Sequence, residues 1–256
     1  MVSGRVSGLI ALLIIFGTMM LGINRAKKQL PTIRKIAGLE AIDEAVGRAT
    51  EMGKPIFCTP GWSDITTSTA APTFAALDII HHVARLAARF DTKLVVAIAY
   101  PNVFPLAEQV VRQAFVLEGK ADVYEPGTVV FTSPEQYAYA AACLGIIQRE
   151  KVAATILVGH FASEAINFAE ASAAVGAISI AGTESTTQLP FFTAACDYTM
   201  IGEELLAAGA YISQDPVRLG SINGQDYVKL FSFMWILIGS LVTTIGSMWM
   251  KDILTR

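Results

Sequence analysis

The stretch "KPIFCTPGWSDITTST", Lys54–Thr69, joins a short apolar run to a turn and then to a series of hydroxyl side chains. Its apolar part, Ile56–Cys58, does not alternate with polar residues, which indicates a strand buried on both faces. Such strands are typical of parallel sheets covered by helices. The stretch therefore predicts an α/β domain, and the 13 residues from Thr59 to Ala71 form a longer strand-to-helix loop than the usual about 2–6 residues.

The same pattern recurs four more times toward the C-terminus. Each apolar run is followed by a turn rich in Gly, Pro, Ser or Thr and then by a stretch with helical periodicity. The later runs are "KLVVAIAY" (93–100), "GTVVFTS" (127–133), "ATILVGH" (154–160) and "AISIAGT" (177–183). Five strands that alternate with helices predict an open doubly wound, mainly parallel five-stranded sheet of the Rossmann-like type. We place this α/β domain at residues 38–226.

The stretches between the strands predict helices. Ile79, Val83 and Leu86 form one apolar stripe at helical spacing. Ser133, followed by Pro134 and Gln136, predicts an N-cap with a capping box. Residues 191–212, "FFTAACDYTMIGEELLAAGAYI", are interpreted as one further helix, interrupted near Gly202.

Two uncharged apolar segments flank this domain. They are "LIALLIIFGTMMLGI" (Leu9–Ile23) and "LFSFMWILIGSLVTTIGSMWM" (Leu230–Met250). Because a helix needs about 20 apolar residues to cross a bilayer, we predict transmembrane helices at residues 6–24 and 229–250. A cleaved signal peptide is the alternative for the first, but no small-residue cleavage site follows it.

Lys and Arg residues concentrate between the two apolar segments, above all in the basic juxtamembrane segment 25–37. By the positive-inside rule, this predicts a two-span inner-membrane protein with a cytoplasmic α/β domain and membrane lipid as a partner. The two spans are expected to pair as an antiparallel hairpin. Small residues of the second span allow close helix contact within one chain or between subunits, which predicts a homo-oligomer or a membrane-complex subunit. These residues are Gly239, Thr243, Gly246 and Ser247.

Composition and motifs exclude several classes of protein. A formal net charge of -3 gives no indication of nucleic-acid binding. GxGxxG and GxxxxGK[ST] are absent, and "GWSD" has Ile65 where a nucleophile elbow needs glycine. His81 and His82 are adjacent on a helix and point about 100° apart, so they do not form a metal pair. We therefore predict no cofactor and no metal.

In open parallel sheets, ligands bind at the carboxyl ends of the strands. The five loops at those ends contain hydroxyl, amide and carboxylate side chains beside helix N-termini, which suits an anion or a polar small molecule. The candidate ligand-binding residues are Thr59, Ser63, Asp64, Asn102, Ser133, His160, Ser163, Glu184, Ser185 and Thr186.

Two catalytic arrangements are considered for these loops. Cys58, His160 and Glu184 would serve as nucleophile, base and orienting group, and Glu164 with Glu184 would serve as an acid/base pair. The alternatives are that Cys58 is packed under a helix layer and that Glu164 interacts with a helix dipole. Because the sequence fixes none of the distances, no catalytic residue is predicted.

The segments "CTPGWSDITTSTAAPTF", "LVGHFASEAINFAEA" and "AGTESTTQLPFF", set between two apolar segments, resemble an uncharacterised family of prokaryotic membrane-anchored α/β proteins. The resemblance implies no activity and no catalytic residue. The leading hypothesis is a membrane-anchored binding or assembly module that self-associates. The alternatives are a hydrolase or transferase acting on a small polar or lipid-derived substrate, and a small-ligand sensor.

Overall fold

The computed structural model describes residues 6–31 and 35–244 of the chain. It divides into two compact units, of which one comprises Met1–Ile33 with Gln214–Arg256 and the other Arg34–Ser213. The second unit is the α/β domain predicted from the apolar runs. The first contains the two helices nearest the chain ends.

The α/β unit is built on one open sheet in which every strand pairs in parallel with its neighbours. The strand order is β3-β2-β1-β4-β5-β6. Chain order therefore reverses between β1 and β4, which is the topological switch point of a doubly wound sheet. The strands are β1 (Ile56–Gly61), β2 (Leu94–Ile98), β3 (Val129–Phe131), β4 (Ala154–His160), β5 (Ile178–Thr183) and β6 (Tyr198–Ile201).

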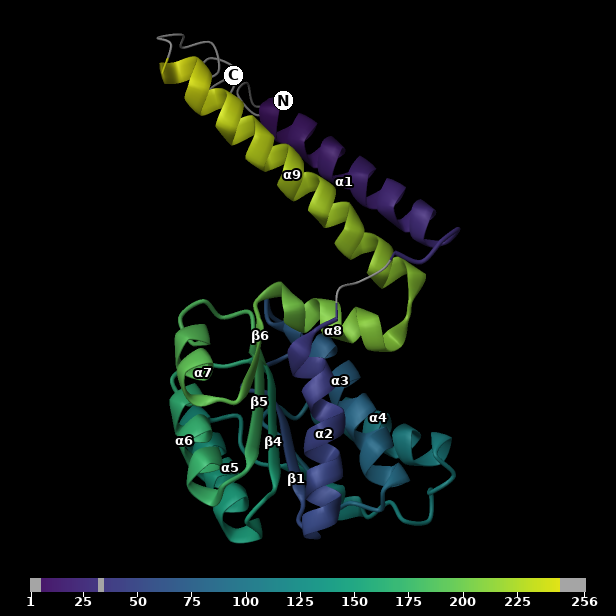
Figure 1. Cartoon of the computed structure of the whole chain (residues 1–256), viewed down its shortest axis with the longest axis vertical. Helices are drawn as coiled ribbons and strands as arrows, with labels where there is room; N and C mark the ends of the chain where they lie inside the picture. The colour runs from purple at the N-terminus through teal and green to yellow at the C-terminus, as the bar shows by residue number, and fades with distance from the viewer. Residues whose placement is uncertain (1–5, 32–34, 245–256) are drawn as a thin grey trace. The chain divides into compact units, whose positions relative to one another are not determined.

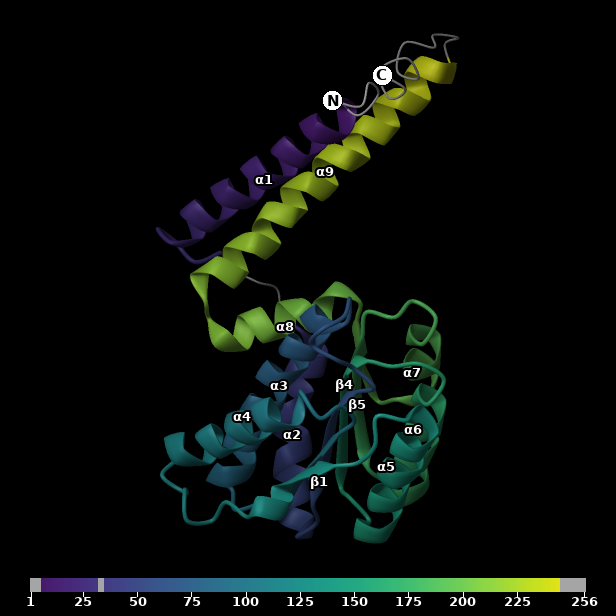
Figure 2. The same ribbon diagram turned by 180° about the vertical axis from the view of Figure 1, so that it is seen from behind.

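Helices cover both faces of this sheet, as Figures 1 and 2 show from opposite sides. One layer consists of α2 (Ala37–Met52), α3 (Ala70–Arg89) and α4 (Phe104–Leu117), with α8 (Glu203–Ser213) against α3. The other layer consists of α5 (Gln136–Glu150), α6 (Ala165–Val175) and α7 (Leu189–Ala195). A 3-10 turn, η1 (Pro126–Thr128), leads into β3.

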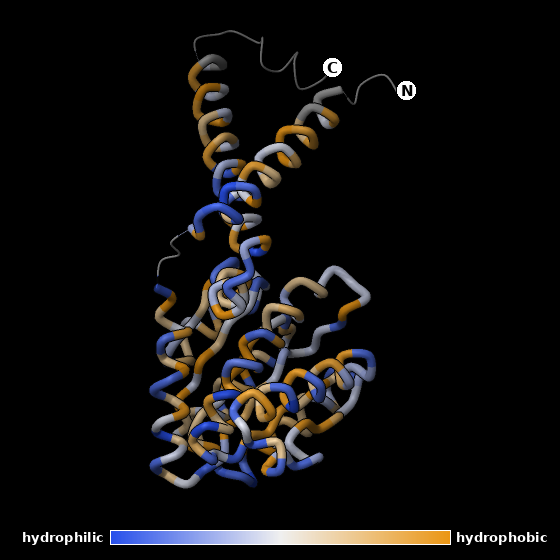
Figure 3. Tube along the Cα trace, turned by 90° about the vertical axis from the view of Figure 1, so that its right-hand side faces the viewer, coloured by the Kyte–Doolittle hydropathy of each residue, from blue (hydrophilic) through white to orange (hydrophobic). Residues whose placement is uncertain are grey.

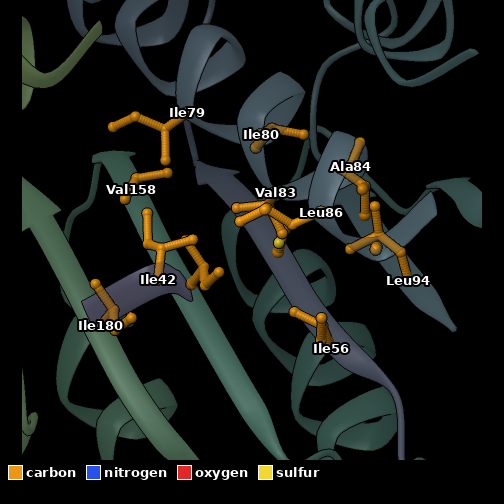
Figure 4. Close-up of a cluster of buried hydrophobic side chains, with 14 of the residues drawn as sticks. Ile42, Ile56, Ile79, Ile80, Val83, Ala84, Leu86, Leu94, Val158 and Ile180 are labelled. Carbon is orange, nitrogen blue, oxygen red and sulfur yellow. The ribbon is translucent and has the colours of Figure 1, made fainter. Parts of the chain in front are cut away.

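The side chains of each strand alternate between two apolar cores. In β1, Ile56 and Cys58 belong to the core under α2 and α3, whereas Phe57 belongs to the core under α5 and α6. Figure 4 shows the first core, where Ile42 of α2 and Ile79 of α3 lie over the sheet near Val158. Burial on both faces explains why the strands lack polar alternation.

The five predicted strands are confirmed, but the prediction missed a sixth, β6, inside the stretch interpreted as one helix. α7 ends because Cys196 adopts an extended backbone with φ -101° and ψ 151°. The carboxylate of Asp197 then accepts hydrogen bonds from the Ser179 N–H and hydroxyl, both at 2.8 Å, which fixes the next residues beside β5. Because β6 has only four residues, flanking helical periodicity concealed it.

The predicted capping box is also wrong by two residues. The N-cap of α5 is Glu135, whose Oε2 accepts a hydrogen bond from the Ala138 N–H at 2.7 Å. Ser133 instead accepts a hydrogen bond from the Glu135 N–H at 3.1 Å, and so it shapes the turn that precedes the helix. Gln136 does not cap α5. Its side chain instead donates a hydrogen bond to Glu164 at the start of α6.

The other unit is a hairpin of α1 (Val6–Ala26) and α9 (Pro216–Thr244), which lie side by side and antiparallel, as predicted (Figure 1). Glycines allow this close approach. A Cβ atom at Gly220 would lie 2.5 Å from Ile23 Cα, and one at Gly224 would lie 2.7 Å from Met19 Cα. Both glycines lie in the first part of α9.

The prediction of two transmembrane spans, and with it the inner-membrane localisation, is wrong. Across the described ranges 6–31 and 35–244, no helix is both long and apolar enough to cross a membrane. Asp226 and Lys229 lie within α9, before its uncharged residues 230–244. α1 contains Gly17, Thr18 and Asn24 among its apolar residues. Residues 245–250 of the predicted second span, including Gly246 and Ser247, lie outside the described residues.

Candidate functional site

The carboxyl ends of β1 and β4 meet at the switch point, where a doubly wound sheet usually opens a crevice for a ligand. Here the two strand ends are instead closely paired, with Gly61 opposite His160 after an irregularity in register. Gly61 and Gly159 have φ of +80° and +128°, and a Cβ at either would collide with the backbone carbonyl of His160 or Pro60. The backbones of the two strand ends are thus in close contact, and polar side chains gather on the loops beside them.

The most direct contact between the loops joins His160 and Glu184. His160 is the last residue of β4, Glu184 follows β5, and their Nδ1 and Oε1 atoms lie 2.6 Å apart. Both side chains are partly exposed, at 28% and 32%. The second carboxylate oxygen, Glu184 Oε2, is buried and has no hydrogen-bond partner in the described part of the chain. In this pair, the contact with Glu184 Oε1 holds the His160 imidazole in place. Glu184 Oε2 remains a hydrogen-bond acceptor without a donor among the described residues.

The hydrogen bond to Glu184 raises the pKa of His160 above its ordinary value of about 6.5, against the opposing effect of burial. A raised pKa in the folded state means that the pair's contribution to stability is complete below about pH 6.5 and is lost as pH rises through the folded pKa. His81 and His82 shift oppositely, because burial lowers the pKa of both.

We expect an NMR titration to give a higher pKa for the His160 imidazole than for those of His81 and His82. In Glu184→Gln, the His160 pKa should fall, because the charged partner that favours the imidazolium is gone. The two helical histidines serve as internal controls, since neither has Glu184 among the causes of its shift. A His160 pKa that is unchanged in Glu184→Gln would contradict the assigned hydrogen bond.

A second carboxylate lies at the start of α6. Glu164 is only 2% exposed, and its Oε1 accepts a hydrogen bond from the Ala162 N–H at 3.0 Å. Its Oε2 accepts one from Gln136 Nε2 at 2.6 Å, and Gln136 also reaches the Ser163 hydroxyl at 3.1 Å. A protein carboxylate thus already occupies this helix start, which makes it a poor anion site. Gln136 was not a predicted site residue, because its sequence position suggested a helix cap.

The loops after β1 and β2 form a separate cluster. Asn102 Nδ2 donates to Asp64 Oδ1 at 2.5 Å, and the Thr66 hydroxyl donates to Asp64 Oδ2 at 2.7 Å. Asn102 Oδ1 is buried and has no partner in the described ranges. The rings of Trp62 and Tyr100 flank this cluster with their centroids 5.9 Å apart. Neither aromatic residue was among the predicted candidates, because aromatics near strand ends are ordinary core residues.

The remaining candidates contact other parts of the fold or their own loop. Thr59 is fully buried and contacts Tyr139, while the Ser63 hydroxyl donates to the Pro60 carbonyl at 3.0 Å and accepts from Thr73. Ser185 interacts with Thr183 and Thr187 of its own loop, and Thr186 is exposed. The structure thus joins two pairs of candidates across loops, His160–Glu184 and Asp64–Asn102. The hydrogen bonds described for the other candidates are to residues outside the predicted set.

The structure does not bring Cys58, His160 and Glu184 together as a catalytic triad. Cys58 is fully buried in the core under α3, and burial raises the pKa of its thiol. His160 is opposite Gly61, three residues further along β1 than Cys58. At about 3.3 Å per residue, this separates the two positions by about 10 Å. The packed alternative for Cys58 therefore fits the structure.

A six-stranded parallel sheet in this strand order, with helices on both faces and polar loops at its carboxyl edge, defines a Rossmann-like α/β protein. Over residues 1–254 the chain matches the family model described as a domain of unknown function, DUF6754. The chain belongs to this family, which confirms the predicted resemblance to an uncharacterised family. It matches no curated protein and no solved structure.

Proposed function

We propose that this protein is a binding module whose loops after β4 and β5 hold a small polar ligand through His160 and Glu184. The observation that carries the proposal is the buried Glu184 Oε2, which has no donor among the described residues. A buried acceptor left unpaired costs about 1–3 kcal/mol. A ligand that donates a hydrogen bond there would remove this cost, so binding and stability are coupled.

The charges around the pair favour a neutral or cationic ligand over an anion. Glu184 shares its edge of the sheet with Glu164, whose carboxylate accepts a hydrogen bond from the Ala162 N–H just before α6. His160 is the basic side chain that contacts Glu184 there. A ligand with a hydroxyl or an amine suits this arrangement, because it supplies the donor that Glu184 lacks.

Thermal-shift screening of the full chain with sugars, polyols, amines and nucleosides tests this proposal. A ligand at 100 times its Kd stabilises by about 2.7 kcal/mol, and each kcal/mol raises Tm by about 2–4 °C in a chain of this size. At least one probe with a hydroxyl or amine should stabilise the wild-type protein.

The same probe should lose its effect in Glu184→Gln, in which a donor amide replaces one acceptor oxygen. Glu170→Gln is the matched control. Glu170 is an exposed acidic residue on α6, and its substitution by Gln removes the same charge as Glu184→Gln. A shift that persists in Glu184→Gln, or that disappears equally in Glu170→Gln, would refute the assignment. So would a complete screen without any stabilising probe.

A further inference from the structure

A groove lies on the α1–α9 hairpin, in the unit that the proposed function does not use. Its volume is about 490 Å³, and its lining is almost entirely apolar surface. Five of its six lining residues nevertheless carry polar groups. Arg25 Nη1 donates to the Tyr227 hydroxyl at 3.4 Å, and Lys28 lies in the turn that follows α1. The lining residues are Thr18, Leu21, Asn24, Arg25, Lys28 and Tyr227.

The cationic groups of this groove are not neutralised by the protein. Within the described ranges, neither Arg25 nor Lys28 forms an ion pair with a carboxylate. The acidic residue of α9 nearest in sequence to Tyr227 is Asp226, which contacts Lys229 at 3.3 Å instead. Because the surface of the groove itself is almost entirely apolar, Arg25 and Lys28 line it with their apolar stems. Their charged ends lie outside that lining, where a bound anion would complement them.

An exposed apolar surface continues from the groove along the hairpin. Figure 3 shows hydrophilic residues where α1 ends and α9 begins, and hydrophobic residues toward the chain ends. Leu21 lines the groove and is 67% exposed. Further apolar side chains of α1 and α9, on the way from the groove to the chain ends, are also exposed. These exposed side chains include Leu9, Leu12, Leu13, Phe16, Leu230, Phe231 and Met234.

We propose that this groove binds an anionic lipid, with its phosphate headgroup on Arg25 and Lys28 and its acyl chain along Leu21 and the exposed leucines of α1. Guanidinium and ammonium groups are the usual ligands of phosphate oxygens, and Arg bonds two of them in parallel. The apolar continuation accounts for the chain, because each buried methylene adds favourable free energy. An anion without a chain would use only half of the site.

The test measures binding of the full chain to phosphatidylcholine vesicles with and without phosphatidylglycerol. Binding should be tighter with phosphatidylglycerol, and Arg25→Gln or Lys28→Gln, each made alone, should weaken that gain at least about tenfold, as expected for a charged hydrogen bond. Lys27→Gln is the matched control: it removes the same charge from the adjacent residue, which does not line the groove. Its loss should not exceed about fivefold, the effect of one charge near an anionic surface.

The acyl chain is tested by a second matched pair. Leu21→Asn should weaken binding more than Leu117→Asn, because both leucines are exposed, at 67% and 58%, but Leu117 belongs to α4 in the α/β unit and is no part of the proposed site. Equal losses in Lys27→Gln and the groove variants would overturn the proposal in favour of diffuse charge. Competition by glycerol phosphate as strong as that of the lipid would show a headgroup site alone. A chain that dimerises through the hairpin and ignores both vesicles would also overturn it.

Discussion

Gly159→Ala is expected to prevent the α/β unit from folding or to destabilise it by at least about 4 kcal/mol. A Cβ at this position would collide with the Pro60 carbonyl across the β1–β4 pair, and φ of +128° lies where residues other than glycine are strained. Backbone strain of this kind costs about 1–3 kcal/mol, and moving a central strand costs further packing. β1 and β4 lie in the middle of the sheet, so the strain has no edge to relax into.

Gly176→Ala is the matched control for this expectation. Gly176 also has a positive φ, +72°, at the end of α6, but a Cβ there would meet no atom within 4 Å. Gly176→Ala should lower the free energy of unfolding by about 1 kcal/mol, because only the left-handed backbone conformation is then unfavourable. Urea unfolding followed by circular dichroism measures both variants. Similar losses in the two would mean that the strand contact at the switch point is not as close as described.

The strands that could be predicted are those with a strong local signal. Apolar runs such as Ile56–Cys58 are buried on both faces, so the sequence pattern and the tertiary position agree. β6 has no such local signal. Its four residues, Tyr198–Ile201, are placed beside β5 with the help of the contacts of Asp197 with Ser179. Those contacts depend on tertiary structure, which local periodicity does not encode.

The candidate site was predictable to the level of loops but not of contacts. The rule that ligands bind at carboxyl strand ends selected both His160 and Glu184, because each directly ends or follows a strand. It could not indicate that Gly61 and Gly159 bring the backbones of the two strand ends into close contact, since that depends on register. Nor could it separate side chains that turn inward from those that stay at the edge, as Thr59 illustrates.

Thr59 points inward because it shares the strand face of Phe57, toward the core under α5. Its hydroxyl donates to the Ala97 carbonyl at 2.8 Å, so the Tyr139 hydroxyl, at 2.7 Å, donates to it in turn. Both residues are fully buried. The hydroxyl thereby joins β1, β2 and α5.

Thr59→Val should destabilise the α/β unit by about 2–3 kcal/mol, because it leaves the buried Tyr139 hydroxyl without its acceptor. Tyr139→Phe should cost less, about 1–2 kcal/mol, since Thr59 still bonds Ala97. The double variant should cost less than the sum of the two, which a double-mutant cycle by urea unfolding measures.

Thr132→Val provides the control for Thr59→Val. The Thr132 hydroxyl also donates to a carbonyl of β2, that of Ile98 at 2.9 Å, but the Thr132 N–H donates to the same oxygen. The carbonyl keeps a partner, so this change should cost less than about 1 kcal/mol. If Thr59 served a ligand instead, Thr59→Val would reduce binding and leave the free energy of unfolding near that of Thr132→Val. Additive losses in the cycle would likewise contradict the contact between Thr59 and Tyr139, because residues that do not interact contribute independently.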